Sequence, residues 1–274
     1  LPHPMKLAGY LPRDGVAENI RDFRDLTADE LKQHALFKPV VAEARNRLAL
    51  FRVLDDNYRE WTDALAALLH PGPADEDPAA QKLDRLLLNY LACAYHLRAH
   101  FETSFQQRFR TDGSEQKKYK MLVDNLGQSA WSFAFFLDFQ HYLKHQGLGL
   151  GFFKRRVGPT SVAVELTLNA NELLNATKDW PRSKLAPAKG IMELTALLRD
   201  FHTQMLQSYS GIVIQTLFAD LPPAADFYKK LAAEVRTQDP GLTMTLRNGE
   251  SDPRLHPAPN DLFAELGLAI TVKK

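Results

Sequence analysis

Residues 41–68 read VAEARNRLALFRVLDDNYREWTDALAAL, and apolar side chains recur in them every three or four residues. The positions with this spacing are Val41, Ala44, Leu48, Phe51, Leu54, Tyr58, Trp61, Leu65 and Leu68. Such a stripe places the apolar groups on one face of an α-helix. We therefore predict an amphipathic helix of about thirty residues, ended by the turn His70-Pro71-Gly72-Pro73.

Two further long helices are predicted downstream. One covers about residues 78–109, the other covers about residues 129–146, and a short helix lies between them at about 115–126. Long helices joined by short loops pack as antiparallel neighbours. The predicted fold class is therefore mainly α, a long-helix bundle. Its core is expected to hold one cluster of phenylalanines from both helices, namely Phe101, Phe105, Phe136 and Phe139.

Some β structure is predicted after these helices. Apolar side chains alternate with small or polar ones at Val162, Val164, Leu166 and Leu168. This alternation is the period of a half-buried strand, and it predicts a small β-hairpin attached to the bundle at about residues 148–168. Helix is expected again from residue 190, and short C-terminal strands are expected at 242–246 and 269–272.

These patterns divide the chain into three segments. Residues 1–38 form an N-terminal segment with a short helix, which begins at the capping box Thr27-Ala28-Asp29-Glu30 and ends before Pro39. Residues 39–218 hold the helical bundle with its hairpin. Residues 219–274 are expected to add a C-terminal helix and short strands packed on the bundle.

The composition argues against a general polyanion binder. Lysine and arginine total 34 against 33 aspartate and glutamate residues, so any nucleic-acid contact must come from a local basic patch. The single cysteine, Cys93, cannot form an internal disulfide, fits a reducing compartment and lies in an apolar helical stretch as a small buried hydrophobe. A glycine-rich phosphate loop is absent from the sequence, and no cofactor is predicted.

A membrane helix is not predicted either. The most apolar window, residues 131–153, carries polar or charged side chains in its middle, among them Asp138, His141 and Lys144. The expected location is therefore the cytoplasm.

Two pairs of histidines have the spacing of a helical metal site. His96 and His100 stand four residues apart, as do His141 and His145, so each pair shares one helix face. Two such pairs on neighbouring helices could supply four ligands. The alternative is that all four are partly exposed polar positions beside the aromatic stripes, because nine histidines on long helices produce such pairs by chance.

A basic cluster, Lys154-Arg155-Arg156, follows the third long helix, and three further lysines lie at positions 117, 118 and 120. Each cluster could contact phosphate. An equally good interpretation of Lys154-Arg155-Arg156 is a solvated strand edge that charge protects from pairing.

Two stretches of the sequence are similar to a known family. The first runs from Leu87, Asn89 and Tyr90 through Tyr95 and His96 to His100, and the second is FQHYLKHQGL at residues 139–148. The strand at 164–168, followed by Glu172-Leu173-Leu174 and Trp180, extends the likeness. Over residues 40–218 the chain resembles the HEPN superfamily of helical-bundle domains, in particular poorly characterised bacterial members.

The resemblance implies a ribonuclease-like site. Many members cleave RNA with the arginine and histidine of an Arg-x4-His motif, in a cleft that forms where two subunits meet. His145 matches the histidine, whereas Gln140 stands at the arginine position and His141 follows it. A glutamine cannot place positive charge on a scissile phosphate.

The first hypothesis is therefore a HEPN-like homodimer that binds RNA, a nucleotide or a protein partner in stress or defence, with weak or absent ribonuclease activity. Its expected nucleic-acid contacts are Lys144, Lys154, Arg155 and Arg156. The alternatives are an active metal-independent ribonuclease using His145 and His141, a metal-binding bundle using His96, His100, His141 and His145, and a purely structural interaction module.

Overall fold

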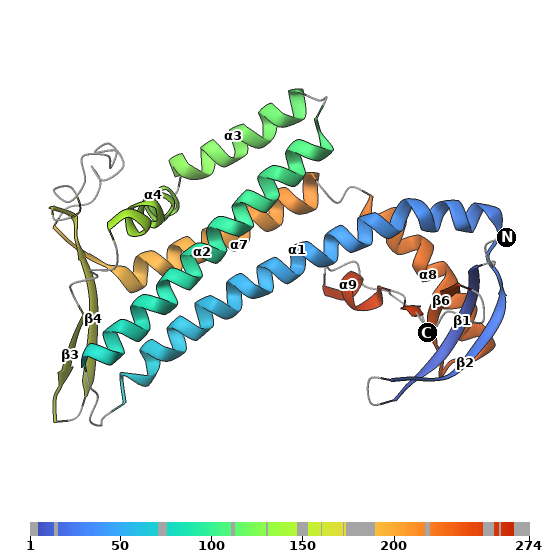
Figure 1. The fold of residues 1–274 in the computed structure, drawn as a ribbon, viewed down its shortest axis with the longest axis horizontal. Helices are drawn as coiled ribbons and strands as arrows, with labels where there is room; N and C mark the ends of the chain where they lie inside the picture. Colours follow the sequence, from blue (N-terminus) through green and yellow to red (C-terminus); the bar gives the residue numbers. More distant parts are fainter. Residues whose placement is uncertain are drawn as a thin grey trace. The chain divides into compact units, whose positions relative to one another are not determined.

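The fold was analysed in a computed structural model. It describes residues 5–13, 16–70, 76–110, 113–129, 131–146, 153–159, 161–171, 173, 190–216, 220–248, 255–257 and 259–265. The chain forms two compact units, the terminal unit (Leu1–Leu48 with Phe218–Lys274) and the central unit (Ala49–Leu217). The structure is mainly helical, as predicted (Figure 1).

Helix α1 (Ala28–Ala67) contributes to both units. The prediction that a short helix ends before Pro39 is wrong, because Pro39 lies inside α1. Proline removes one backbone N–H from the helix ladder, so the helix must be held by other contacts there. In the terminal unit Phe37, Val41 and Ala44 are all buried around this position, and their packing keeps the helix continuous.

Among the described residues, the central unit holds α1 after residue 48 together with α2 (Glu76–Arg108), α3 (Gly113–Ser129), α4 (Trp131–Gln146) and α7 (Leu194–Thr216). Within this unit α1, α2 and α7 run side by side (Figure 1). Tyr58 of α1 contacts Tyr90 of α2, and Tyr90 contacts Phe201 of α7.

The predicted packing of α2 with α4 is confirmed, and the four phenylalanines predicted for the core are all buried. Phe101 stacks on Tyr209 at 5.4 Å, and Phe136 lies 5.0 Å from Phe201, measured between ring centroids. Phe105 instead stacks on Tyr119 of α3. Burying each such aromatic side chain is worth about 1.5–3 kcal/mol, so this aromatic cluster contributes to the stability of the unit.

A small antiparallel sheet completes the central unit. Its strands are ordered β3-β4-β5, with β3 at Phe153–Val157, β4 at Val162–Asn169 and β5 at Ile191–Glu193. Strands β3 and β4 pair from Phe153↔Leu166 to Val157↔Val162, inside the range of the predicted hairpin. Leu166 and Leu168 are buried, in agreement with the alternation of apolar side chains along β4.

The terminal unit joins the two ends of the chain in one sheet of order β2-β1-β6-β7. Its strands are β1 (Met5–Arg13), β2 (Val16–Asp25), β6 (Thr243–Asn248) and β7 (Leu255–Pro257), all paired antiparallel. The strands β1 and β2 were not predicted, β6 corresponds to the strand expected at 242–246, and the strand expected at 269–272 lies outside the described residues.

Helix α8 (Leu221–Gln238) packs on β1 and β6, and the short helix α9 (Asn260–Glu265) belongs to the same unit. A Cβ at Gly9 of β1 would come within 3.0 Å of Val235 and Leu242. The close approach of α8 to the sheet therefore favours glycine at this position.

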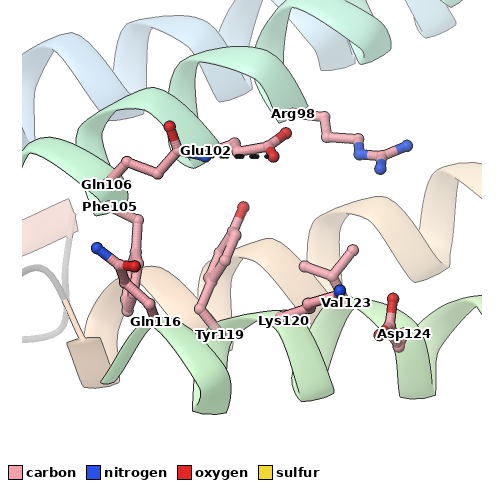
Figure 2. A pocket seen from close by; sticks show the side chains of 9 residues that line it. All are labelled: Arg98, Glu102, Phe105, Gln106, Gln116, Tyr119, Lys120, Val123 and Asp124. Atoms are coloured by element: carbon pink, nitrogen blue, oxygen red, sulfur yellow. Dashed lines mark hydrogen bonds between the residues drawn. The ribbon is translucent and has the colours of Figure 1, made fainter. Parts of the chain in front are cut away.

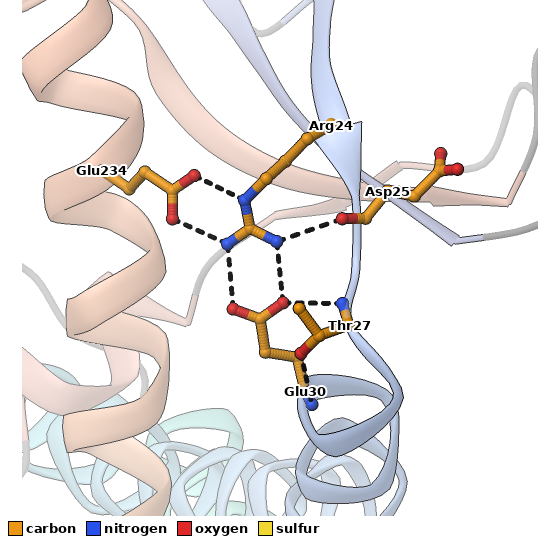
Figure 3. Close-up of polar contacts among 5 residues, drawn as sticks. All are labelled: Arg24, Asp25, Thr27, Glu30 and Glu234. Atoms are coloured by element: carbon orange, nitrogen blue, oxygen red, sulfur yellow. Dashed lines mark hydrogen bonds and ion pairs between the residues drawn. The ribbon is translucent and has the colours of Figure 1, made fainter.

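A cluster of ion pairs fixes the start of α1 (Figure 3). Arg24 of β2 donates from two nitrogens to Glu234 of α8, at 2.6 and 2.7 Å, and from two nitrogens to Glu30 of α1, at 2.7 and 2.8 Å. Glu30 and Thr27 form the predicted capping box, since each accepts from the other's backbone N–H. The hydrogen bonds from Arg24 lower the pKa of Glu30 to about 2.

Candidate functional site

The residues expected from the family resemblance lie in the last turns of α4. Gln140, His141, Lys144 and His145 all belong to this helix, which ends at Gln146. The side chains of these four residues lie outside the described part of the structure. Whether Gln140 and His145 flank one groove therefore stays a prediction.

The two other histidines of the predicted metal set lie on α2. Both His96 and His100 are exposed there, one helical turn apart. Among the described residues, no three His, Cys, Asp or Glu side chains are grouped so as to hold a metal ion. The side chains of His141 and His145 are not among those residues, so the four-histidine site stays a prediction.

Two residues of the basic cluster on β3 have partners within the protein. The Arg155 guanidinium donates to the carbonyl oxygens of Leu68 and His70, at 2.9 and 2.8 Å, just after the end of α1. Arg156 pairs with Glu165 of β4 at 3.3 Å. Arg155 therefore satisfies carbonyl groups that follow α1, and it could contact phosphate only by leaving them. Lys154 and Arg156 are exposed.

A cavity of about 380 Å³ lies between α2 and α3 in the central unit (Figure 2). Its lining comes from two helix faces, since the residues of each helix are spaced by three or four positions. They are Arg98, Glu102, Phe105 and Gln106 on α2, and Gln116, Tyr119, Lys120, Val123 and Asp124 on α3. From the sequence, Phe105 was predicted for the core, and Lys120 was the only one of these residues predicted to contact a ligand. The others were missed because the packing of two helices, and no local motif, brings them together.

The cavity combines charged groups of both signs with a rigid aromatic wall. Arg98 and Lys120 supply cations, and Glu102 and Asp124 supply carboxylates. The rings of Phe105 and Tyr119 stack at 4.4 Å with an angle of 18° between their planes, and both are buried. In Figure 2 the Tyr119 ring stands between the two helices.

Two amide groups add polar contacts along the same lining. The Gln116 amide donates to the Phe109 carbonyl oxygen at 2.8 Å, which fixes its orientation. The Gln106 amide donates to Glu102 at 3.5 Å. The lining therefore offers cationic donors, anionic acceptors and amides within one small volume.

One buried hydroxyl of the central unit, that of Tyr209, lies outside the lining of this cavity. Tyr209 of α7 is fully buried, and within the described part of the chain its Oη has no hydrogen-bond partner. Burial raises the pKa of Tyr209, and the charges that act on this phenol belong to three lining residues, Tyr119, Arg98 and Glu102. Buried polar groups are nearly always hydrogen-bonded, so a hydroxyl without a partner among the described residues is unusual.

A second polar cluster lies in the aromatic core, centred on His202 of α7. The His202 Nε2 lies 3.2 Å from Asp55 Oδ1, and its Nδ1 lies 3.2 Å from Tyr90 Oη. Tyr58 stacks on the imidazole with ring centroids 3.9 Å apart. Because both ring nitrogens are bonded and one face is covered, His202 cannot act as a general base toward a substrate.

Comparison with known proteins gave no relatives. No family model matches the chain, and no curated protein or solved structure matches it either. The HEPN resemblance therefore stays a prediction that rests on the residues quoted for it. Within the described ranges, no helix combines the length and apolarity of a membrane span.

Proposed function

We propose that the chain binds RNA or a nucleotide in the cavity between α2 and α3, with weak or no ribonuclease activity. The observation that carries this proposal is the lining of that cavity, which places Arg98 and Lys120 beside carboxylates, amides and an aromatic wall. A cavity of about 380 Å³ is at the lower end of the range for small-ligand sites. It fits one nucleotide unit, and a double helix is far too wide for it.

Each part of a nucleotide has a suitable partner in the lining. Arg98 and Lys120 would hold the phosphate, since charge-assisted hydrogen bonds to phosphate are the strongest that side chains make. Glu102 and Asp124 can accept from ribose hydroxyls or exocyclic amines. The lysine and the aspartate stand one turn apart on α3, so they would contact different parts of the same ligand.

The Tyr209 hydroxyl is the further contact that we expect for a ligand that reaches past the lining residues. Such a ligand would extend beyond Arg98 and Glu102, whose charges act on this phenol. Bases and ribose both carry acceptors for this hydroxyl.

Weak catalysis follows from the residue at the expected arginine position. Gln140 can donate a hydrogen bond, but it brings no positive charge to a phosphate in the transition state. Loss of one such charged group costs about a hundredfold or more in rate. The homodimer and the protein partner that the resemblance implies remain part of this proposal.

The test is binding of a fluorescent single-stranded RNA, followed by anisotropy and by competition with nucleoside monophosphates. We expect Arg98→Gln and Lys120→Gln each to weaken binding by about tenfold or more. Each should also lower the slope of log K against log salt by about one. Lys118→Gln is the matched control, because Lys118 lies on the same helix, pairs with Glu115 and does not line the cavity.

Any of three results would contradict the proposal. One is that the wild type binds neither the oligonucleotide nor a mononucleotide. The others are that the cavity variants bind as tightly as the Lys118→Gln control, or that the wild type cleaves RNA rapidly.

A further inference from the structure

We propose that His202 is an acid-sensitive latch: its protonation removes the acceptor of the Tyr90 hydroxyl proton and loosens the packing of α1, α2 and α7 in the central unit. The proposal is independent of the ligand. It rests on the two 3.2 Å contacts of the imidazole, on the stacked Tyr58 ring and on the burial of His202 and Tyr90.

The direction of both hydrogen bonds follows from the chemistry of the partners. Asp55 is ion-paired with Arg59 at 2.6 Å, and an ionised carboxylate can only accept. The His202 Nε2–H therefore donates to Asp55 Oδ1 in the neutral imidazole. Its Nδ1 then has no proton, so Nδ1 accepts from the Tyr90 hydroxyl. Neutral His202 satisfies both neighbours at once.

Protonation of the His202 imidazole removes this arrangement of donors and acceptors. The added proton sits on Nδ1, which becomes a donor, and Tyr90 can no longer donate to it. The Tyr90 side chain is fully buried, with the rings of Phe201 and Tyr58 against it. Its hydroxyl proton is then left among apolar groups, where an unpaired donor is costly.

The charged and titratable groups around the imidazole act in opposite directions. From α1, Asp55 favours the imidazolium, while Arg59 disfavours it and competes for the same carboxylate. Tyr58 of α1 covers the ring, and Arg199 of α7 acts on Tyr58. From α2 the group that faces His202 is the Tyr90 hydroxyl.

Asp200, two residues before His202 on α7, forms a second polar pair with Ser132 of α4. Asp200 accepts a hydrogen bond from Ser132 of α4, so its carboxylate has a partner of its own.

Burial is the largest effect, and it lowers the pKa of His202 below its ordinary value of 6.5. The unfolded chain then binds this proton more readily than the folded chain does. The stability that neutral His202 provides is therefore complete above pH 6.5, and it is lost as the pH falls through the lower pKa of the folded state.

Thermal unfolding of the full chain between about pH 7.5 and about pH 5 tests the latch. Tryptophan fluorescence follows the central unit, because Trp61 and Trp131 belong to it. His202→Gln keeps one donor and one acceptor but cannot titrate. The exposed His96→Gln is the control.

We expect the melting temperature of the wild type and of His96→Gln to fall by a few degrees more across this range than that of His202→Gln. An equal fall in all three proteins would overturn the proposal.

A measurement on the wild type keeps the test decisive if His202→Gln does not fold. Nitrogen chemical shifts of the imidazole report its tautomer directly. At neutral pH we expect the proton on Nε2, with an apparent pKa below 6.5. A proton on Nδ1, or an imidazolium at neutral pH, would overturn the latch.

Discussion

At the scale of single residues, the hydroxyl of Tyr209 tests whether a bound ligand reaches beyond the lining of the cavity. The ring is needed in the core, where it stacks on Phe101 and lies near Phe133. The hydroxyl adds nothing to that packing, and within the described residues it has no hydrogen-bond partner. A buried hydroxyl in this situation lowers the stability of the ligand-free protein.

Tyr209→Phe should therefore stabilise the free protein and weaken its binding of nucleotide. Removing a buried unpaired polar group gains about 1–3 kcal/mol, and urea unfolding measures this change. If Tyr209→Phe instead lowers the free energy of unfolding and leaves the nucleotide affinity unchanged, the hydroxyl already has a partner and the ligand does not reach it. Tyr228→Phe, which removes a hydroxyl bonded to His34 in the terminal unit, is the matched control and should be destabilising.

Gln140 permits a prediction about catalysis. If the last turns of α4 form a HEPN-like site, Gln140→Arg supplies the missing positive charge, five residues or about 140° around the helix from His145. We expect this variant to cleave RNA faster than the wild type by about a hundredfold, and His145→Ala to abolish the gain. Cleavage by the wild type that survives His145→Ala would place the chemistry elsewhere.

At the scale of secondary-structure elements, Arg155 of β3 holds the residues that follow α1. Its two hydrogen bonds satisfy the carbonyl oxygens of Leu68 and His70, which have no further turn of helix to accept from. Arg155→Gln should lower the free energy of unfolding by about 1–3 kcal/mol in a urea titration followed by tryptophan fluorescence.

Arg156→Gln is the matched control for this prediction. Arg156 is exposed and its pair with Glu165 is solvated, so the change should cost no more than about 1 kcal/mol. Equal effects of the two substitutions would contradict the role given to Arg155.

The sequence was informative about elements whose side chains repeat with a clear period. The apolar stripe of residues 41–68 predicted most of α1, and Phe136 and Phe139 of α4 are buried as predicted. The helix end predicted before Pro39 was wrong, because the packing of Phe37, Val41 and Ala44 outweighs the tendency of proline to end a helix. The Phe105–Tyr119 pair could not be foreseen, since it depends on how α3 lies against α2.

At the scale of the whole molecule, the two ends of the chain belong to one sheet. Strand β1 pairs with β6 from Met5↔Asn248 to Tyr10↔Thr243. No local pattern in either segment reveals a partner so far away in the sequence, and β1 lacks the alternation that marked β4. The sequence therefore predicted separate N-terminal and C-terminal segments where the fold has one terminal unit.

The same limit applies to the candidate site. The histidines of α2 and the basic residues of β3 were predicted as site residues because the members of each group lie close together in the sequence. The cavity, by contrast, joins Arg98 to Lys120 and Asp124 across two helices. The buried contacts of His202 likewise join α7 to Asp55 and Tyr90 on two other helices.

Backbone chemical-shift mapping during a titration with adenosine monophosphate tests the central claim most directly. It observes the whole chain at once and needs no substitution. The account predicts that the largest changes cluster at Arg98, Glu102, Tyr119 and Lys120, on the facing sides of α2 and α3. Changes centred on the end of α4 or on β3, with α2 and α3 unaffected, would contradict it.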